Sequence, residues 1–310
     1  EVIAPSITFI APINAIKYCN AEPVFMDSDN FFNIDIEKVI LFLNKNTYMK
    51  NNHCYNKITK KRISAVIIVH VWGNLVDLDS LILICKKKKI KIIEDASEAL
   101  GSFYSKGMFK NKHAGTIGDV GCLSFNGNKI ITSGAGGMIL TNKKSLSKNA
   151  EYLINQAKDN SKYYIHNEIG YNFRLTNLHS AIGLAQLEKI NEILKIKKNI
   201  HNHYKKIFNK IKGIDILENP SFSRSNNWLN ILRVGKDFKK NIKWIEKKLK
   251  KNNIECRFIW WPNHKQKQYL KNFKYKITNT DNLINYSLCL PSSINIKKND
   301  IIKIANLINE

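Results

Sequence analysis

The alternation of short β-branched runs with helical stretches restricts the fold of this chain more than any other feature. Residues 65–71, Ala-Val-Ile-Ile-Val-His-Val, form a nearly continuous apolar run, which is typical of a strand covered on both faces. Residues 79–89 follow with apolar side chains at helical spacing, and residues 90–95 form the next strand. Further strands are expected at residues 120–125 and 137–141. This order of elements predicts a parallel α/β sheet in the first two-thirds of the chain.

The pattern changes near Asn177. One or two long helices are expected from Leu178 to about Lys212, with a bend near Asn191 or Lys198. Shorter elements follow, namely a strand at residues 228–234, a helix at 238–251, a strand at 254–260 and a helix at 298–309. The sequence therefore predicts a large α/β domain over residues 1–190 and a smaller α+β domain over residues 191–310.

The charge of the chain bears on its partners. The 310 residues carry a formal net charge of +25, which is compatible with a nucleic-acid partner. The lysines, however, accompany an excess of Ile and Asn throughout, and no basic segment is interleaved with aromatic residues. We therefore expect no nucleic-acid partner and keep a basic nucleic-acid-binding protein as an alternative. No apolar run is long enough to cross a bilayer and no signal segment opens the chain, so we expect a cytoplasmic protein without a membrane partner.

No metal-binding or redox motif is readable in the sequence. The six cysteines include no C-x-x-C pair. His201 and His203 are two residues apart, which places them on different faces of a helix. We expect no bound metal.

Two polar segments follow predicted strands. Glu94 and Asp95 end the strand at residues 90–95, and ligands of open α/β sheets gather outside the carboxyl ends of strands. Asp95 could instead cap a helix that follows. The second segment runs from Ser124 to Lys129, and a glycine-rich turn at residues 133–137 comes soon after it. Small residues there let the backbone approach a bound group, although Lys129 by itself could be a surface lysine.

A third polar segment covers residues 167–177, Asn-Glu-Ile-Gly-Tyr-Asn-Phe-Arg-Leu-Thr-Asn. Thr176 and Asn177 are suitable caps for the helix that begins near Leu178. Capping leaves Tyr171, Asn172 and Arg174 unexplained.

Together these segments resemble the sugar aminotransferases of the DegT/DnrJ/EryC1/StrS family, over nearly the whole chain. The resemblance is carried by residues 5–9, 21–27, 69–73, 94–101, 118–125, Lys129, the glycine-rich turn and residues 170–174. Within the family, residues 124–129 and 165–172 are most similar to the subgroup that serves legionaminic-acid-type sugars.

The resemblance implies fold type I of the pyridoxal phosphate (PLP) enzymes, the aspartate-aminotransferase type, and a role for each site residue. Lys129 would bond covalently to the PLP aldehyde and move a proton once it is freed. Asp95 would pair with the pyridine nitrogen and keep it protonated. Ser124 would hold the phosphate, and Phe9 would stack on the ring. Asn172 would reach the phosphate of a partner subunit, which implies a homodimer with shared active sites, and Arg174 and His264 are candidates for substrate binding.

Two departures from the family pattern stand out. Members commonly carry Gln three residues after the ring-pairing Asp, whereas this chain has Glu98, as the legionaminic-type subgroup does. A protonated Glu98 could donate to the ring hydroxyl as Gln does. Members also have a segment before the strand at residues 1–9, with a Ser-Gly-Thr turn that grips the phosphate. We therefore expect a chain shortened at its N-terminus, with weaker hold on the phosphate.

The implied reaction is of the ping-pong type. L-glutamate would supply the amino group, and the acceptor would be the 4-keto carbon of a nucleotide-diphosphate-linked 6-deoxy-2-acetamido sugar for surface polysaccharide. Amination at position 3 of a deoxysugar and a non-catalytic remnant are the alternatives. A PLP sugar dehydratase is disfavoured, because those relatives carry His where Lys129 stands.

Overall fold

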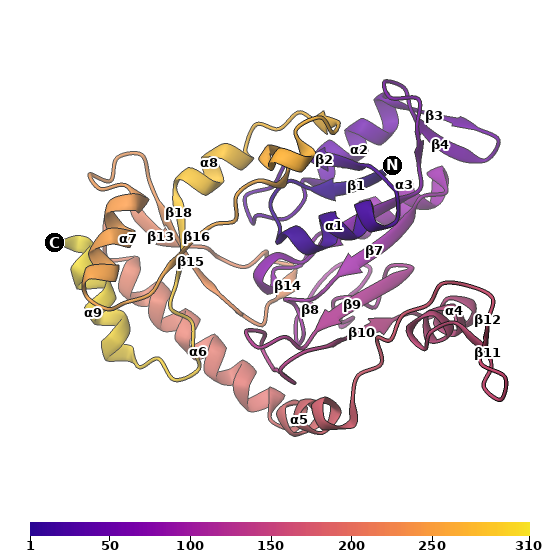
Figure 1. Cartoon of the computed structure of the whole chain (residues 1–310). Coiled ribbons are helices and arrows are strands. Elements are labelled where there is room, and N and C mark those ends of the chain that lie inside the picture. The colour runs from indigo at the N-terminus through magenta and orange to yellow at the C-terminus, as the bar shows by residue number, and fades with distance from the viewer.

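A mostly parallel sheet of seven strands forms the centre of the molecule (Figure 1). The computed structural model describes residues 1–310. The strands lie in the order β10-β9-β7-β6-β1-β2-β17, and β10 alone runs antiparallel to its neighbour. Their bounds are β1 Val2–Pro5, β2 Pro23–Met26, β6 Ala65–Val69, β7 Lys91–Asp95, β9 Val120–Ser124, β10 Gly137–Leu140 and β17 Lys274–Tyr275.

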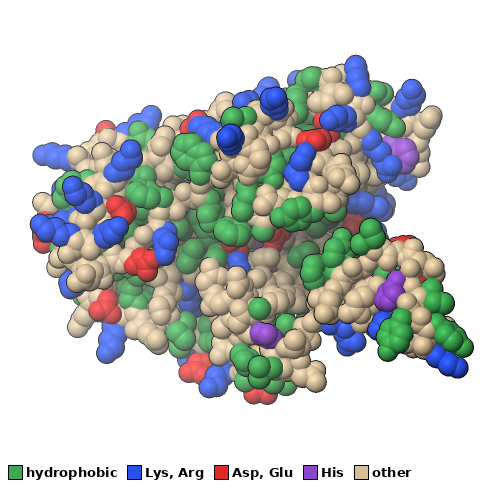
Figure 2. Space-filling model, viewed as in Figure 1, with side chains coloured by type: hydrophobic (Ala, Val, Ile, Leu, Met, Phe, Trp, Pro, Cys, Tyr) green, Lys and Arg blue, Asp and Glu red, His purple; other side chains and the backbone are tan.

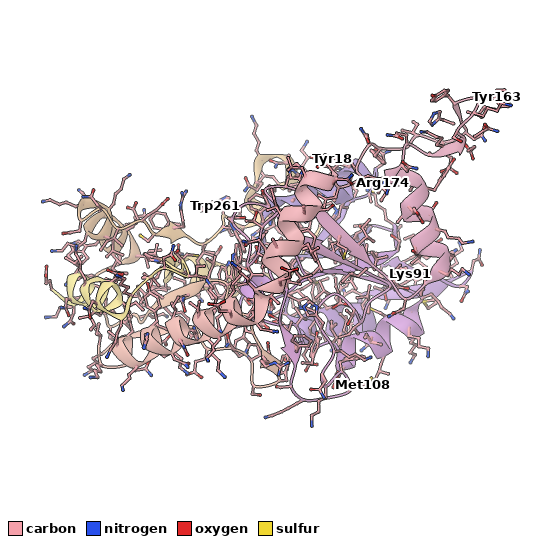
Figure 3. All side chains as sticks on the ribbon, turned by 90° about the horizontal axis from the view of Figure 1, so that it is seen from below. Tyr18, Lys91, Met108, Tyr163, Arg174 and Trp261 are labelled. Carbon is pink, nitrogen blue, oxygen red and sulfur yellow. The ribbon has the colours of Figure 1, made fainter.

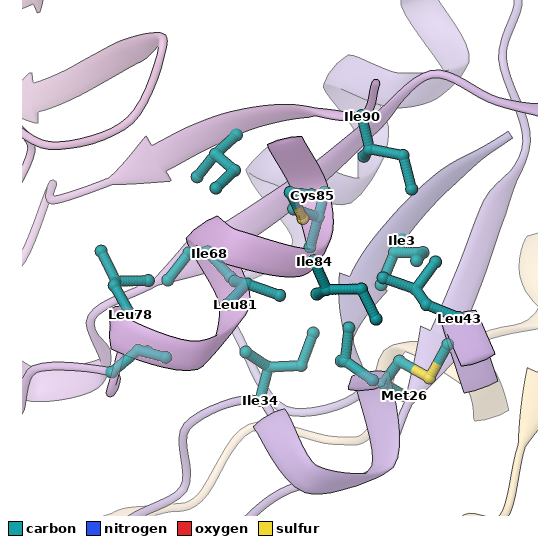
Figure 4. Close-up of a cluster of buried hydrophobic side chains, with 14 of the residues drawn as sticks. Ile3, Met26, Ile34, Leu43, Ile68, Leu78, Leu81, Ile84, Cys85 and Ile90 are labelled. Atoms are coloured by element: carbon teal, nitrogen blue, oxygen red, sulfur yellow. The ribbon is translucent and has the colours of Figure 1, made fainter. Parts of the chain in front are cut away.

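Helices cover both faces of this sheet because successive strand side chains point to opposite sides. Ile3 packs with α2 (Ile36–Lys45) and α3 (Asp79–Lys88) on one face, in the cluster drawn in Figure 4. Ala4, the next residue, packs with α1 (Ile10–Tyr18) and with residues from the C-terminal half on the other face. Strands buried on both faces explain the continuous apolar runs of the sequence.

The C-terminal half forms a second sheet and core. Helices α5 (Asn177–Glu188) and α6 (Ile190–Phe208) connect the first half of the chain to this sheet (Figure 1). Its antiparallel strands lie in the order β13 Ile214–Ile216, β15 Asn230–Val234, β18 Ser287–Leu290 and β16 Arg257–Phe258. Helices α7 (Ile242–Lys251) and α9 (Lys298–Asn309) pack against it together with α6.

The remaining elements are mostly short and lie outside the two main sheets. A projection, which we define as residues 144–173, extends from the body in Figures 1 and 2, and Figure 3 places Tyr163 at its tip. It consists of α4 Lys144–Ile154, β11 Lys158–Asn160 and β12 Ile165–His166 with their connections. The others are β3 Thr47–Lys50, β4 His53–Asn56, β5 Arg62–Ile63, β8 Phe103–Tyr104, β14 Ser223–Arg224, α8 Thr280–Asn285, and the 3-10 turns η1 Val71–Gly73, η2 Asn263–Lys265 and η3 Lys267–Tyr269.

The structure confirms the expected α/β class and corrects several elements. The long helix breaks at Lys189, whose φ of −96° and ψ of 3° depart from helical values. This break lies two residues from Asn191, one of the two positions expected for a bend, and α6 continues through Lys198. Helix α7 begins at Ile242, because the Asn241 side chain accepts from the backbone N–H of Trp244 and caps it. The strand expected at residues 254–260 shrinks to Arg257–Phe258, the two residues that pair with β18. No helix combines the length and the apolar character needed to span a membrane.

Candidate active site

The carboxyl ends of four neighbouring parallel strands open onto one cavity of about 1260 Å³. Phe9 follows β1, Trp72 follows β6, Asp95 ends β7 and Ser124 ends β9. Parallel strands end at the same edge of a sheet, so residues far apart in the sequence meet there, as open α/β sheets dictate for ligand sites. Phe9, Asp95, Glu98, Ser124 and Lys129, all predicted from the sequence, line this cavity.

The two acidic residues that end β7 have different surroundings. Glu94 is fully buried, where it accepts from Nε2 of His70 (3.0 Å) and from the backbone N–H groups of Gly115, Ile117 and Gly118. Burial alone would raise the pKa of Glu94, but these donors hold it below its usual value. Glu94 therefore links the end of β7 to His70 and to the turn at residues 115–118.

Asp95 lines the cavity, and its Oδ1 accepts from the backbone N–H of Ser97 (3.0 Å). Residues 96–102 form turns and no helix. The helix-cap alternative for Asp95 is therefore wrong, and the carboxylate faces a space that can take a ligand.

Glu98 is buried between a backbone amide and an amine. Its Oε2 accepts from the N–H of Trp72 (2.8 Å), and its Oε1 lies 3.7 Å from Nζ of Lys129. Burial raises the pKa of Glu98 to about 7 even though the Lys129 ammonium opposes the shift. Trp72 has a φ of 54°, a left-handed value that costs free energy for a bulky residue.

Lys129 sits in a short turn after β9. Its backbone N–H donates to the carbonyl of Asn126 (3.1 Å), and only 14% of its side chain is exposed. This low exposure argues against the surface-lysine alternative, since lysines are rarely withdrawn from solvent without a partner. The glycine-rich turn that follows has φ values of 83° at Gly134 and 90° at Gly136, which glycine adopts without strain.

A segment of the C-terminal half completes the site and was not anticipated from the sequence. Trp228 lines the cavity with its ring 4.6 Å from Nζ of Lys129. Asn226 is 1% exposed and donates to the carbonyls of Glu98 (2.8 Å) and Leu100 (2.9 Å). The signal available was the run Asn226-Asn227-Trp228, a large aromatic residue directly after two polar ones before a strand.

Three other predicted residues do not line the cavity of this chain. Asn172 is exposed, and its Oδ1 accepts from Nε2 of Gln156 (3.0 Å) at the base of the projection. Arg174 is also exposed (Figure 3). His264 is buried in η2 against the ring of Phe25, with 6.3 Å between ring centres. His264 therefore lies in the protein core and does not line the cavity, and burial lowers its pKa.

Thr176 caps α5 as expected, because its hydroxyl accepts from the N–H of His179.

The groups around the cavity fit PLP. The cofactor combines an aldehyde, a pyridine nitrogen, a ring hydroxyl and a phosphate. The cavity offers a shielded amine on Lys129, carboxyl groups on Asp95 and Glu98, and a hydroxyl on Ser124. The aromatic ring of Phe9 is 55% exposed at the same edge.

Comparisons with known proteins agree with this geometry. GDP-perosamine synthase of Escherichia coli O157:H7 is 34% identical over 100% of this chain and 78% of its own length. EpsN of Bacillus subtilis (strain 168), whose name assigns it to the pyridoxal phosphate-dependent aminotransferases, is 32% identical over 97% of this chain and 74% of its own.

A solved structure is also similar. PseC of Helicobacter pylori, an aminotransferase involved in the biosynthesis of pseudoaminic acid, superposes with a TM-score of 0.84 at 25% identity, over 99% of this chain and 78% of that one. The model of the DegT/DnrJ/EryC1/StrS aminotransferase family matches residues 1–309. The chain therefore belongs to the DegT/DnrJ/EryC1/StrS aminotransferase family.

Proposed function

We propose that this PLP-dependent aminotransferase moves an amino group from L-glutamate to the 4-keto carbon of a nucleotide-linked 6-deoxy-2-acetamido sugar. The observation that carries the proposal is the shielded amine of Lys129, which shares a cavity with Asp95 and Glu98 at the strand ends. Perosamine and pseudoaminic acid in the names of similar proteins support a sugar acceptor. The legionaminic-type pattern at residues 124–129 supports the acetamido sugar.

The residues that line the cavity have separate roles in the proposed reaction. PLP, when bound, supplies an electron sink that lets an amino group leave one carbon and enter another. Lys129 holds and returns a proton at Nζ, and Asp95 offers a carboxylate to the ring nitrogen. Glu98 offers its carboxyl to the ring hydroxyl, and Ser124 offers its hydroxyl to the phosphate. Phe9 and Trp72 contribute aromatic side chains to the cavity lining, and Phe9 would stack on the ring of the cofactor.

We also propose that two copies assemble with shared sites. Helices α4 and α5 contain no buried residue, although α5 carries Leu178, Ile182, Leu184 and Leu187. The projection exposes further large apolar side chains, including Tyr164, Ile169 and Phe173. Exposed apolar surface of this extent is typical of a protein interface, and two-fold dimers are the commonest symmetric assembly. In such a dimer Asn172 would serve the phosphate of the neighbouring site.

The test of the reaction is a substrate panel. The purified chain is mixed with PLP, L-glutamate and 4-keto or 3-keto sugars linked to UDP, GDP or dTDP, and the amino sugar is measured by mass spectrometry. Product from a 4-keto 2-acetamido sugar, absent in a Lys129→Ala variant, is expected. Product from 3-keto sugars alone would place amination at position 3. No product from any sugar and no spectral change with L-glutamate would contradict aminotransfer.

A further inference from the structure

A tryptophan from the C-terminal half contacts the lysine loop at two points. The ring centre of Trp228 lies 4.6 Å from Nζ of Lys129, within the range of cation–π attraction. The indole N–H of Trp228 donates to the carbonyl of Asn128 (2.8 Å), the residue directly before the lysine. One side chain therefore contacts both the amine end of Lys129 and the backbone from which it extends.

Every polar group of Trp228 makes a hydrogen bond. Its backbone N–H donates to Oδ1 of Asn226 (2.9 Å), and its carbonyl accepts from the ammonium of Lys197 (2.6 Å). Lys197 is 4% exposed and also donates to the carbonyl of Ser292, so it joins α6 to the segment after β18. Hydrogen bonds therefore hold both the backbone of Trp228 and, through the indole N–H, its ring.

The amine of Lys129 has a second neighbour besides this ring. Oε1 of Glu98 lies 3.7 Å from Nζ. A lysine side chain has a flexible four-carbon stem and samples many positions unless contacts restrict it. The ring of Trp228 and the carboxyl of Glu98 are the two contacts that restrict it here.

We propose that Trp228 is a positioning residue for Lys129. Its ring holds the free amine beside Glu98, and its N–H fixes the turn from which the amine extends. Trp228 acts through the lysine and needs no contact with a substrate. This inference rests on the proposed function in one respect, that Lys129 is the reacting amine.

The first experiment measures the reactivity of Lys129 in the full chain without cofactor. A short acetic anhydride pulse is followed by digestion, and acetylation of Lys129 is compared with that of exposed Lys106. Trp228→Leu should raise the ratio roughly tenfold, since the cation–π contact is lost. Trp228→Phe keeps a ring and should raise it less than about threefold. Trp261→Leu removes an exposed ring 5.7 Å from Lys265 and should leave the Lys129 ratio unchanged.

An unchanged ratio in a Trp228→Leu protein with the wild-type circular dichroism spectrum would overturn the proposal. A second measurement uses the wild-type protein, so it does not depend on whether a Trp228 variant folds. Lysines of the wild-type protein are dimethylated with ¹³C, and the Lys129 resonance is identified by its loss in Lys129→Arg. We expect this resonance upfield of the exposed lysines because it lies over an aromatic ring. A Lys129 resonance among those of the exposed lysines would refute the contact.

Steady-state kinetics, read together with acetylation and NMR, distinguish a failure of this proposal from a failure of the proposed function. In the holoenzyme, Trp228→Leu should lower kcat roughly tenfold and leave the KM for the amino donor unchanged. Acetylation and NMR report on the Trp228 contact even if the wild-type chain shows no turnover. A change of KM alone, without a change of kcat, would mean that Trp228 binds the donor and does not position the lysine.

Discussion

Nζ of Lys129 lies 3.7 Å from Oε1 of Glu98, and both side chains are largely withdrawn from solvent. The two residues come from different strand ends, since Lys129 follows β9 and Glu98 follows β7. Adjacent pairing of these strands, with Asp95 opposite Cys122, brings the two turns together. The charge of the Lys129 amine lies close enough to act on the buried Glu98 carboxyl, and this relationship leads to the first two predictions.

Lys129→Ala should abolish transamination and leave the fold intact. Lys129 is the lysine that lies beside Glu98, whereas the other lysine that lines the cavity, Lys303, comes from α9 of the C-terminal half. The measurement is borohydride reduction of the PLP-loaded protein followed by peptide mapping, which should label Lys129 in the wild type. Lys106→Ala, at an exposed site, is the matched control and should retain activity. Label on a different lysine would refute the assignment.

Glu98→Gln should change how stability depends on pH. Burial raises the pKa of Glu98 to about 7 in the folded protein, whereas the usual value is 4.5. The folded state therefore binds this proton more tightly than the unfolded state. Its stabilising effect is complete below pH 4.5 and is lost as the pH rises through 7, a loss of up to roughly 3 kcal/mol.

Urea unfolding of the cofactor-free protein at several pH values checks this prediction. The free energy of unfolding of Glu98→Gln, relative to wild type, should increase between pH 5 and pH 8. Exposed Glu192→Gln should show no such trend. A constant difference between Glu98→Gln and wild type across this range would show that the Glu98 carboxyl does not titrate there.

Asp95→Asn should still bind PLP but lower kcat by about 100-fold, a usual cost of losing one placed electrostatic group. The amide keeps the shape of the side chain and its hydrogen bond from Ser97, but it removes the negative charge from the cavity. Single-turnover rates with L-glutamate, followed by absorbance, measure the effect. Wild-type rates would mean that Asp95 only stabilises the turn at residues 95–97.

Much of the site could be predicted because its residues follow strands with strong local patterns. The run at residues 90–95 marks β7, and its end marks Asp95. Period-2 alternation also explains why Glu94 faces the core while Asp95 faces the cavity. Residues 96–102, by contrast, form turns and not the helix that Asp95 could have capped. Hydrogen bonds at Glu98 and Asn226 stabilise these turns.

The unpredicted features depend on contacts between distant parts of the chain. Trp228 and Asn128 are 100 residues apart in the sequence, and no local sequence pattern predicts that they contact each other. Strand β17 has two residues and joins the central sheet beside β2, too short to show a period. The domain division near residue 190 and the dimer stay predictions.

Leu184→Glu should separate the proposed dimer. Leu184 is 59% exposed on α5, where no residue is buried within one chain. A charge at the centre of an apolar interface is costly to desolvate, so the variant should be monomeric by light scattering while the wild type has twice the chain mass. Ile58→Glu, at a residue with the same 59% exposure in the connection between β4 and β5, is the control and should stay dimeric. A wild-type monomer with full activity would exclude shared sites.

Gly73→Ala should destabilise the protein by about 2–4 kcal/mol, from a left-handed backbone and an overpacked contact. Gly73 has a φ of 89°, and a β-carbon there would collide with Oδ1 of Asn226. Gly127→Ala is the control, because a β-carbon at Gly127 meets nothing within 4 Å. Urea unfolding of both variants measures the difference. In an Asn226→Ala background the collision with Oδ1 is absent and only the looser contact with Oγ of Ser225 (3.1 Å) remains, so Gly73→Ala should cost less, mainly the backbone strain of about 1 kcal/mol. An equal cost in both backgrounds would show that Asn226 does not pack against Gly73, and that the link from Gly73 through Asn226 to Trp228 is not rigid.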